Sequence, residues 1–350
     1  MNPTNTSAKP DIRQLTQEEL QNYFLSKNEP AFRAKQLYQW LWQKGSKDFS
    51  QMTNLSQNLR QQLSEDFTLQ TLQLNLLQKS EDETIKCRFA LHDHYMVEGV
   101  IIPTAERTTA CVSSQVGCSL SCSFCATGKM KRMRNLAASE IFDQVISLNE
   151  LSQKHFQKNL NNIVFMGMGE PLLNYNNTLL AIEKLTQPNA LGMSPRRITV
   201  STAGVAKMIY RLADDNPKVN LALSLHAAND AKRSEIMPIN EQNNLESLRE
   251  ALQYFQNKNG RLLYFEYIMF KNFNDSLQDA KELVRFCRNF PCKVNLIEYN
   301  TVEGTGMHKS EEDALFAFQQ YLQAKNITCT LRRSRGKDID AACGQLANKN

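Results

Sequence analysis

Cys118-Ser-Leu-Ser-Cys122-Ser-Phe-Cys125 places three cysteines within eight residues, in the spacing CxxxCxxC. In a chain without a secretory leader, such crowding indicates metal ligation rather than disulfide bonds, because reducing compartments keep thiols free and neighbouring thiolates on a tight loop converge. A [4Fe-4S] cluster usually takes four cysteines, so a loop that offers three leaves one iron open to a ligand from outside the protein. The stretch therefore predicts an iron–sulfur cluster at which chemistry takes place.

Two other interpretations of the cysteine loop remain open. A structural zinc site normally has four ligands from Cys and His, and neither an HxxxH pair nor a second CxxC accompanies the loop. The remaining alternative is a set of buried structural thiols.

The composition is that of a globular protein. The 350 residues, 41% of them hydrophobic, are enough for one large domain and a smaller accessory one. No stretch approaches the ~18 uncharged apolar residues that span a bilayer, and the start of the chain lacks the apolar core of a signal peptide. We therefore expect a cytoplasmic protein without a membrane segment. The net charge of +5 is only a weak indication of nucleic-acid binding.

Composition and periodicity divide the chain into four parts. Residues 1–12 are rich in Pro, Asn, Ser and Thr, which predicts disorder. Amphipathic helical patterns fill residues 13–66 and predict a small accessory helical domain. Near-alternation of apolar residues in 67–106 predicts a connecting β segment. Residues 107–350 form the core domain.

After residue 107, strand and helix patterns alternate along the chain. Strands that are spaced by amphipathic helices imply parallel β/α units. About six such units, fewer than the eight of a closed barrel, predict an α/β fold of the partial (β/α)6 barrel type, with chemistry at the carboxyl ends of the strands. The candidate strands are 109–113, 163–167, 198–201, 219–225, 262–269, 294–297 and 327–331.

Unusual residues fall at the predicted carboxyl ends of these strands. The cysteine loop follows the first strand, and the motif GMGEP (167–171) follows the second. Its glycine pair lets a ligand approach the backbone closely, and Glu170 is able to accept a hydrogen bond from an ammonium group. Residues 201–204, residues 224–226 and Asn300 follow the third, fourth and sixth strands. This regular placement favours a ligand site over structural turns.

Five separated motifs resemble those of the RlmN family, and the CxxxCxxC spacing itself resembles the radical S-adenosylmethionine superfamily. The resemblance covers the chain from about Pro30 to Leu346. It implies a partial (β/α)6 radical S-adenosylmethionine barrel with a small N-terminal helical domain, connecting strands and a C-terminal catalytic loop. The motifs are CVSSQVGC (111–118), FMGMGEP (165–171), SPRR (194–197), MPIN (237–240) and DIDAACGQ (338–345).

The resemblance implies two cofactors and the residues that hold them. Cys118, Cys122 and Cys125 would bind the [4Fe-4S] cluster, whose open iron takes the amino and carboxylate groups of S-adenosylmethionine. The positions that match the cofactor-contacting residues of the family are Gly169, Glu170, Ser201, Ser224, Leu225, His226 and Asn300.

The resemblance also implies the reaction. RlmN enzymes methylate carbon 2 of an adenosine in the peptidyl transferase centre of 23S rRNA and, in some members, in the tRNA anticodon loop. Two S-adenosylmethionine molecules are used per turnover. The first methylates Cys343, and the second gives a 5'-deoxyadenosyl radical that abstracts hydrogen from the S-methyl group. The resulting methylene radical adds to carbon 2.

Release of the product requires two further groups in this scheme. A proton leaves carbon 2, and either Glu98, which matches the proton acceptor of the family, or Cys111 takes it. Attack by Cys111 then frees the RNA and leaves a Cys111–Cys343 disulfide bond.

RNA recognition is implied less directly. Basic residues occur in runs at 129–134, 196–197 and 332–337. Charged runs are usually solvated faces, but runs near strand ends indicate a phosphate-binding rim. The aromatic residues within 38–42 are helix core more often than a stacking surface for bases. The expected partners are 23S rRNA, tRNA and an electron donor such as flavodoxin or ferredoxin, and we expect a monomer.

Two alternative functions remain. A homologous family methylates carbon 8 of the same adenosine with the same cysteines, but residues 170–174 (EPLLN) resemble the carbon-2 enzymes, since the carbon-8 family carries Ala at the proline position. A non-enzymatic RNA-binding module with a structural metal is the other alternative. It leaves the glycine, serine and asparagine positions at the strand ends unexplained.

Overall fold

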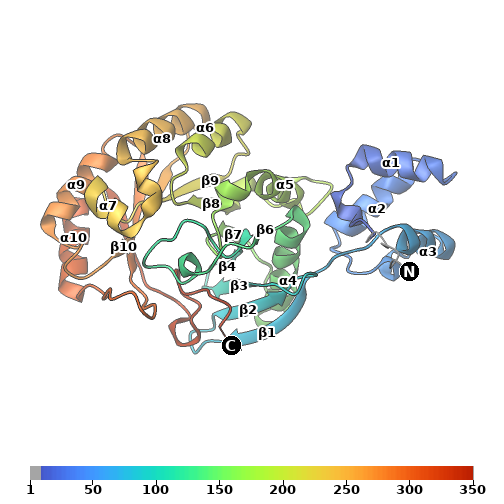
Figure 1. The fold of residues 1–350 in the computed structure, drawn as a ribbon, viewed down its shortest axis with the longest axis horizontal. Coiled ribbons are helices and arrows are strands. Elements are labelled where there is room, and N and C mark those ends of the chain that lie inside the picture. Colours follow the sequence, from blue (N-terminus) through green and yellow to red (C-terminus); the bar gives the residue numbers. More distant parts are fainter. Residues whose placement is uncertain (1–8, 350) are drawn as a thin grey trace, which may run out of the picture.

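The computed structural model describes residues 9–349, which form an α/β barrel with a helical module at one side (Figure 1). Within these residues, ten strands make one sheet in the order β1-β2-β3-β4-β7-β8-β9-β10-β11-β12. In this sheet the strands from β4 onward run parallel to one another, whereas β1 to β3 are antiparallel. The parallel strands are β4 (Thr108–Cys111), β7 (Asn162–Phe165), β8 (Ile198–Thr202), β9 (Asn220–Ser224), β10 (Leu263–Met269), β11 (Cys292–Glu298) and β12 (Thr328–Arg332).

A helix follows each parallel strand except the last one and leads the chain back to the start of the next strand. In the described chain this gives six β/α units closed by β12, which confirms the partial (β/α)6 barrel. All seven strands predicted after residue 107 are present. The crossover helices are α4 (Ala138–Phe156), α5 (Tyr175–Thr186), α6 (Ala206–Asp215), α7 (Asp230–Ile236) with α8 (Leu245–Asn259), α9 (Leu277–Cys287) and α10 (Glu312–Ala324).

Local sequence explains these elements. Strands that are covered on both faces read as continuous apolar runs, and β10 is buried at every position except Tyr264, although it contains Glu266. Helix α9 is capped by Ser276, whose side chain accepts a hydrogen bond from the backbone N–H of Asp279. Asn244 caps α8 in the same way, and such caps satisfy backbone donors that have no partner within the helix.

The N-terminal module consists of α1 (Gln17–Ser26), α2 (Phe32–Trp42) and α3 (Gln57–Asp66). Its aromatic stripe is largely core: Tyr38 and Trp42 are buried, and the Trp42 ring lies edge-on to Phe142 of α4 at 5.2 Å. The hydroxyl of Tyr38 donates to the side-chain oxygen of Gln187 at 2.9 Å. These contacts attach the module to the barrel.

The ordered chain begins earlier than the sequence indicated. Part of the expected disordered segment, residues 1–8, lies outside the described residues. For residues 9–12 the expectation of disorder is wrong, because Ile12 is fully buried and its backbone N–H donates to the carbonyl of Thr68 at 3.0 Å. The apolar side chain of Ile12 outweighs the polar composition around it.

The strands expected in 67–106 are β1 (Gln73–Lys79), β2 (Ile85–Ala90) and β3 (Met96–Pro103), and β3 pairs with β4. They therefore extend the barrel sheet at one edge instead of forming a separate linker. The C-terminal segment (residues 333–349) runs from β12 back to these strands (Figure 1). Arg335 forms an ion pair with Asp82 in the β1–β2 turn at 2.9 Å. This segment joins the two ends of the sheet.

Candidate active site

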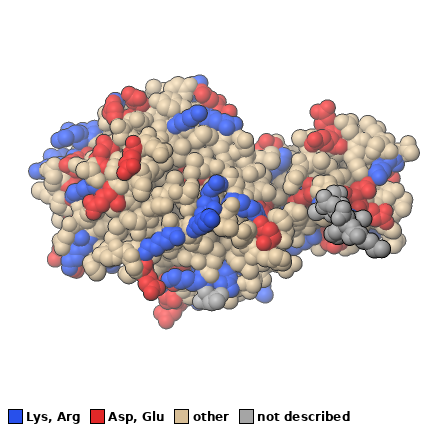
Figure 2. Space-filling model, viewed as in Figure 1, with Lys and Arg blue, Asp and Glu red and all other residues tan. Residues whose placement is uncertain are grey.

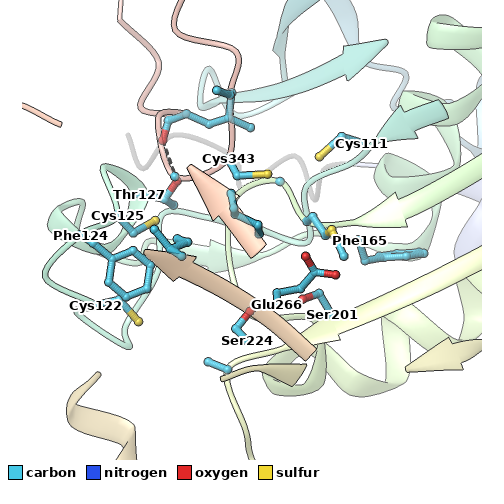
Figure 3. A pocket seen from close by; sticks show the side chains of 18 of the residues that line it. Cys111, Cys122, Phe124, Cys125, Thr127, Phe165, Ser201, Ser224, Glu266 and Cys343 are labelled. Carbon is cyan, nitrogen blue, oxygen red and sulfur yellow. Dashed lines mark hydrogen bonds between the residues drawn. The ribbon is translucent and has the colours of Figure 1, made fainter. Parts of the chain in front are cut away.

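A pocket opens at the carboxyl ends of the parallel strands (Figure 3). It brings together most of the residues that the sequence predicted. The predicted residues that line it are Cys111, Cys118, Cys122, Cys125, Gly169, Glu170, Ser201, Ser224, His226 and Cys343. Three predicted residues, Glu98, Leu225 and Asn300, are not among the lining residues.

The cysteine loop follows β4 and is shaped by glycines. Gly117 has a φ of +74°, and a Cβ atom there would lie 2.2 Å from the carbonyl oxygen of Lys131. A Cβ atom at Gly128 would lie 2.7 Å from the carbonyl oxygen of Cys122. Only glycine fits at these two positions, because the loop folds tightly on itself.

The donor set of this loop fits an iron–sulfur cluster better than a single metal ion. No three Cys, His, Asp or Glu side chains in residues 9–349 lie close enough together to enclose one ion, as a zinc site requires. A [4Fe-4S] cluster makes no such demand, because each cysteine binds a different iron. Burial raises the pKa of Cys118 to about 11 and raises that of Cys122 as well. Thiolates at these positions would therefore depend on the positive charge of bound iron.

Glu170 presents a fixed carboxylate in the pocket wall. One of its oxygens accepts a hydrogen bond from the backbone N–H of Ala203 at 2.7 Å, and the other accepts from Leu172 at 3.0 Å. Burial raises the pKa of Glu170 to about 7, although these two hydrogen bonds act in the opposite direction. A buried carboxylate of this kind gains most from a cationic ligand such as an ammonium group.

Ser201, Ser224 and His226 lie on the neighbouring strand ends. The two serine hydroxyls are 3.4 Å apart and both line the pocket. Nδ1 of His226 accepts the backbone N–H of Ile268 at 3.0 Å, and burial lowers the pKa of His226 to about 3. The imidazole is therefore neutral and its Nε2–H remains a donor. Leu225 is fully buried, so it offers its backbone rather than its side chain.

Cys111 and Cys343 form a pair of thiols separate from the cysteine loop. Cys111 ends β4, Cys343 lies in the C-terminal segment, and their sulfur atoms point toward one another in the pocket (Figure 3). Both thiols are free. Burial, together with the neighbouring Cys343, raises the pKa of Cys111 to about 12.

The segment that carries Cys343 is attached to the cysteine loop. The backbone N–H of Ala126 donates to the carbonyl of Gly344 at 2.7 Å, and the Thr127 hydroxyl donates to the carbonyl of Leu346 at 2.6 Å (Figure 3). Asn300 lies beside the pocket and donates from its side chain to the carbonyl of Cys343 at 3.4 Å. The position of Cys343 is thus coupled to the loop that would hold the cluster.

Glu98 lies outside the pocket lining, in contact with the end of the C-terminal segment. Its side chain is buried within β3, where a solvent-facing carboxylate is the more frequent case. One oxygen accepts the backbone N–H groups of Ala347 at 2.9 Å and Asn348 at 3.2 Å, and Lys86 lies 3.8 Å from the other oxygen. Glu98 therefore holds the end of the C-terminal segment.

Sequence reasoning missed two charged residues of the pocket, Glu266 and Arg332. Glu266 is the one acidic residue in the apolar run of β10, and a carboxylate in such a run was a detectable signal. Arg332 was assigned to a basic run, and its orientation into the pocket has no local signature.

Comparisons with known proteins give the family of the chain. Residues 10–69 match the family described as ribosomal RNA large subunit methyltransferase N-terminal domain, and residues 112–287 match the radical SAM superfamily. A crystal structure of a radical SAM methyltransferase from Sphaerobacter thermophilus superposes with a TM-score of 0.92 at 38% identity, over 97% of this chain and 100% of that chain. A probable dual-specificity RNA methyltransferase RlmN from Christiangramia forsetii is 54% identical, over 98% of this chain and 97% of its own length. The chain belongs to the RlmN family.

Another RlmN relative, the probable dual-specificity RNA methyltransferase from Cytophaga hutchinsonii, is 53% identical over 100% of this chain and 96% of its own length. The RlmN-family protein described here is therefore an RNA methyltransferase of the radical SAM type. Superfamily membership implies S-adenosylmethionine and an iron–sulfur cluster as cofactors. Among residues 9–349, no helix is long and apolar enough to cross a membrane.

Proposed function

We propose that this enzyme methylates carbon 2 of an adenosine in the peptidyl transferase centre of 23S rRNA, and of an adenosine in the tRNA anticodon loop, through an S-methyl group on Cys343. The observation that carries the proposal is the pair of facing thiols, Cys111 and Cys343, in the same pocket as the three-cysteine loop. A methyl carrier that becomes attached to its product needs a second thiol within reach, and Cys111 meets that need.

In this proposal Cys118, Cys122 and Cys125 hold the [4Fe-4S] cluster, and Glu170 accepts the ammonium group of S-adenosylmethionine. When bound, these cofactors supply the methyl group and the hydrogen-abstracting radical, with two S-adenosylmethionine molecules per turnover. The remaining contacts to S-adenosylmethionine come from the backbone at Gly169 and Leu225 and from the side chains of Ser201, Ser224, His226 and Asn300.

The two thiols perform the steps that belong to the protein itself. Cys343 accepts a methyl group on sulfur and, after loss of hydrogen, its methylene carbon becomes bonded to carbon 2. The ring then loses the carbon-2 proton and one electron, and the cluster held by Cys118, Cys122 and Cys125 would supply the acceptor for that electron. Cys111 then attacks the sulfur of Cys343, which breaks the bond between that sulfur and the methylene carbon. The electron pair of the broken bond stays on carbon, which takes a proton and becomes the methyl group. A Cys111–Cys343 disulfide bond remains, and an external thiol must reduce it.

Two groups were candidates to take the proton from carbon 2, and the contacts of each support different roles. Cys111 lines the pocket, whereas the Glu98 carboxylate is engaged by backbone N–H groups of Ala347 and Asn348. We therefore assign the proton to the thiolate form of Cys111, which burial disfavours and the charge of Arg332 favours through the Cys111 pKa. Glu98 takes the role of a positioning residue for the segment that carries Cys343.

The surface around the pocket supports an RNA substrate. Lys and Arg side chains gather over the middle of the barrel face, where the loop after β4 and the C-terminal segment lie (Figures 1 and 2). Lys131 and Arg132 of that loop are exposed. Cations at such a rim would contact phosphates without reading the base sequence. We expect a monomer that takes electrons from a donor such as flavodoxin or ferredoxin.

The test is anaerobic turnover of the reconstituted enzyme on 23S rRNA fragments and tRNA, with mass spectrometry of the modified nucleoside against 2-methyl and 8-methyl standards. We expect 2-methyladenosine from the wild type and none from Cys343→Ala. Cys292→Ala is the matched control, because Cys292 is half-buried in β11 and does not line the pocket; it should keep the activity. Appearance of 8-methyladenosine would assign the chain to the carbon-8 reaction, and an intact cluster without either product would refute the proposal.

A further inference from the structure

A row of polar side chains crosses the interior of the barrel. Glu266 of β10 pairs in register with Ser224 of β9 and with Asn295 of β11, and Asn295 pairs with Thr330 of β12. The Thr330 hydroxyl donates to the Asn295 side-chain oxygen at 2.7 Å, and the Asn295 amide donates to Oε1 of Glu266 at 2.8 Å. Two consecutive groups, Thr330 and Asn295, thus fix the orientation of the Glu266 carboxylate.

The other carboxylate oxygen of Glu266, Oε2, accepts no hydrogen bond in the described chain. Glu266 is 4% exposed and lines the pocket, and within the described chain its Oε2 has no hydrogen-bond donor. Apolar neighbours of the same pocket, Phe165, Ile268 and Ile297, offer none. A buried carboxylate oxygen without a donor is costly, so this one needs a charged neighbour.

That neighbour is Arg332, the last residue of β12. Its Nη1 lies 3.8 Å from Oε2 of Glu266, which is an ion pair but too long for a hydrogen bond. The hydrogen bond that Arg332 makes in the described structure goes to the sulfur of Met166 at 3.8 Å, and a thioether is a weak acceptor. Cys343 and Cys111 are the other charged or ionisable groups that face its guanidinium. Arg332 therefore brings largely uncommitted donors to the two reacting thiols.

We propose that Arg332, held in place by Glu266, donates a hydrogen bond to a ring nitrogen beside carbon 2 of the target adenine. The inference rests on the proposed function, because it assumes that carbon 2 is presented to Cys343. Carbon 2 lies between N1 and N3, and both nitrogens are acceptors. A donor next to the sulfur that bonds to carbon 2 reaches one of them. The bond positions the base and stabilises the charge that builds on that nitrogen when carbon 2 is attacked.

Modified substrates test this contact directly. RNA substrates would carry adenosine, 1-deazaadenosine or 3-deazaadenosine at the target position, so that each analogue lacks one ring nitrogen. Single-turnover methyl transfer would be measured with the wild type and with Arg332→Met. For the wild type, we expect a loss of about 10- to 100-fold on one of the two analogues, the range of a lost hydrogen bond to a charged group.

The decisive result is the coupling between the two changes. Arg332→Met should lose a similar factor on adenosine RNA, and the sensitive analogue should then cost it less than threefold more, because the contact is already absent. If the loss of rate from Arg332→Met multiplied the loss from each analogue, the two changes would act independently and the proposal would be overturned. If Arg332→Met has no measurable rate, dissociation constants for the same three RNAs give the same comparison, since a folded variant without the contact should bind them equally.

A neighbouring arginine provides the matched control. The donors of Arg333 are bound by Glu298 and Glu312. Arg333→Met should therefore lose as much rate on the sensitive analogue as the wild type does, and we call this loss the analogue penalty. Glu266→Gln tests the positioning role, because it keeps an acceptor for Asn295 but removes the charge. We expect a lower kcat with the analogue penalty reduced, and an unchanged penalty would exclude that role. A wild type that makes no methyladenosine would instead refute the proposed function.

Discussion

Arg332 ends β12 and Arg333 begins the C-terminal segment, and these two neighbours belong to different kinds of polar cluster. Arg332 enters the pocket, where its partner Glu266 is 3.8 Å away and one carboxylate oxygen lacks a donor. Arg333 lies at the rim, where it binds both Glu298 and Glu312. Lys309 and Lys337 complete the rim cluster at 3.3 and 2.6 Å from Glu298. Arg332 shares the face of β12 that carries Thr330, and the strand ends before Arg333.

The difference shows what each cluster contributes. Every charge of the rim cluster has a close partner, so it stabilises the connection between β11, α10 and the C-terminal segment. The interior cluster leaves donors and an acceptor without partners, which lowers the stability of the free protein but provides contacts for a ligand. Removing the charge of Glu298 should therefore lower the free energy of unfolding, whereas removing the charge of Glu266 should raise it.

The largest effect is expected for Glu298→Gln. The substitution leaves Lys309, Arg333 and Lys337 close together without their anion, and we expect the free energy of unfolding to fall by about 2–3 kcal/mol. This is less than for a fully buried pair, because the cations are about half exposed. Urea unfolding at pH 7 measures it. The exposed Glu311, paired with Lys271, is the control, and Glu311→Gln should change stability by less than about 0.5 kcal/mol.

The pH dependence of this difference gives the second prediction. Burial alone would raise the pKa of Glu298, but Lys337 and Arg333 outweigh it and lower the pKa from 4.5 to about 2. A lowered pKa adds stability above the unfolded value, which is lost as the pH falls toward the folded value. The difference in free energy of unfolding between wild type and Glu298→Gln should therefore be constant near neutral pH and decrease below about pH 4.5. A gap that does not change between pH 7 and pH 3.5 would contradict this assignment.

A smaller effect is expected for Glu98→Gln. Glu98 differs from both Glu298 and Glu266, because its hydrogen-bond partners are backbone N–H groups of the C-terminal segment. Loss of the charge weakens these bonds by about 1.4 kcal/mol, so amide hydrogen exchange at Ala347 and Asn348 should become about tenfold faster. Hydrogen-exchange mass spectrometry would compare this segment with β8, whose exchange should not change. Unaltered exchange in the segment would mean that the carboxylate does not hold it.

The smallest effect, and the opposite sign, is expected for Glu266→Gln. Burial raises the pKa of Glu266, against the opposing influence of Arg332, so the ionised form costs stability as the pH rises above 4.5. The substitution should raise the free energy of unfolding by up to about 1 kcal/mol near pH 7.5. The gain should disappear near pH 4.5, as thermal melts at the two pH values would show. A destabilised variant at pH 7.5 would indicate that the charge is satisfied in the free protein.

The parts of this structure that were predictable are those with local signatures. The strands of the barrel follow from apolar runs between helical patterns, and the loop from Cys118 to Cys125 follows from its spacing. Glu170 and Ser201 were placed correctly at strand ends because parallel strands bring those ends to one edge. The pocket unites these residues with the other predicted strand-end residues Gly169, Ser224 and His226.

The parts that escaped prediction depend on long-range pairing. The contact between Glu98 and Ala347 spans 249 residues, and nothing near either residue announces it. The pairing of Arg332 with Glu266 depends on the order β10-β11-β12, which places two strands at the right distance and register. The burial of Ile12 likewise depends on its contact with Thr68.

The C-terminal segment has a consequence for how the protein matures. Its ion pair between Arg335 and Asp82 links residues 253 positions apart, so the contact forms late in folding. Regions near the N-terminus fold first during synthesis, and the barrel strands precede this segment on the ribosome. The pocket wall and the proposed methyl acceptor Cys343 are thus added only when translation is nearly finished. A prematurely terminated chain would keep the cysteine loop but would lack Cys343, the proposed methyl acceptor.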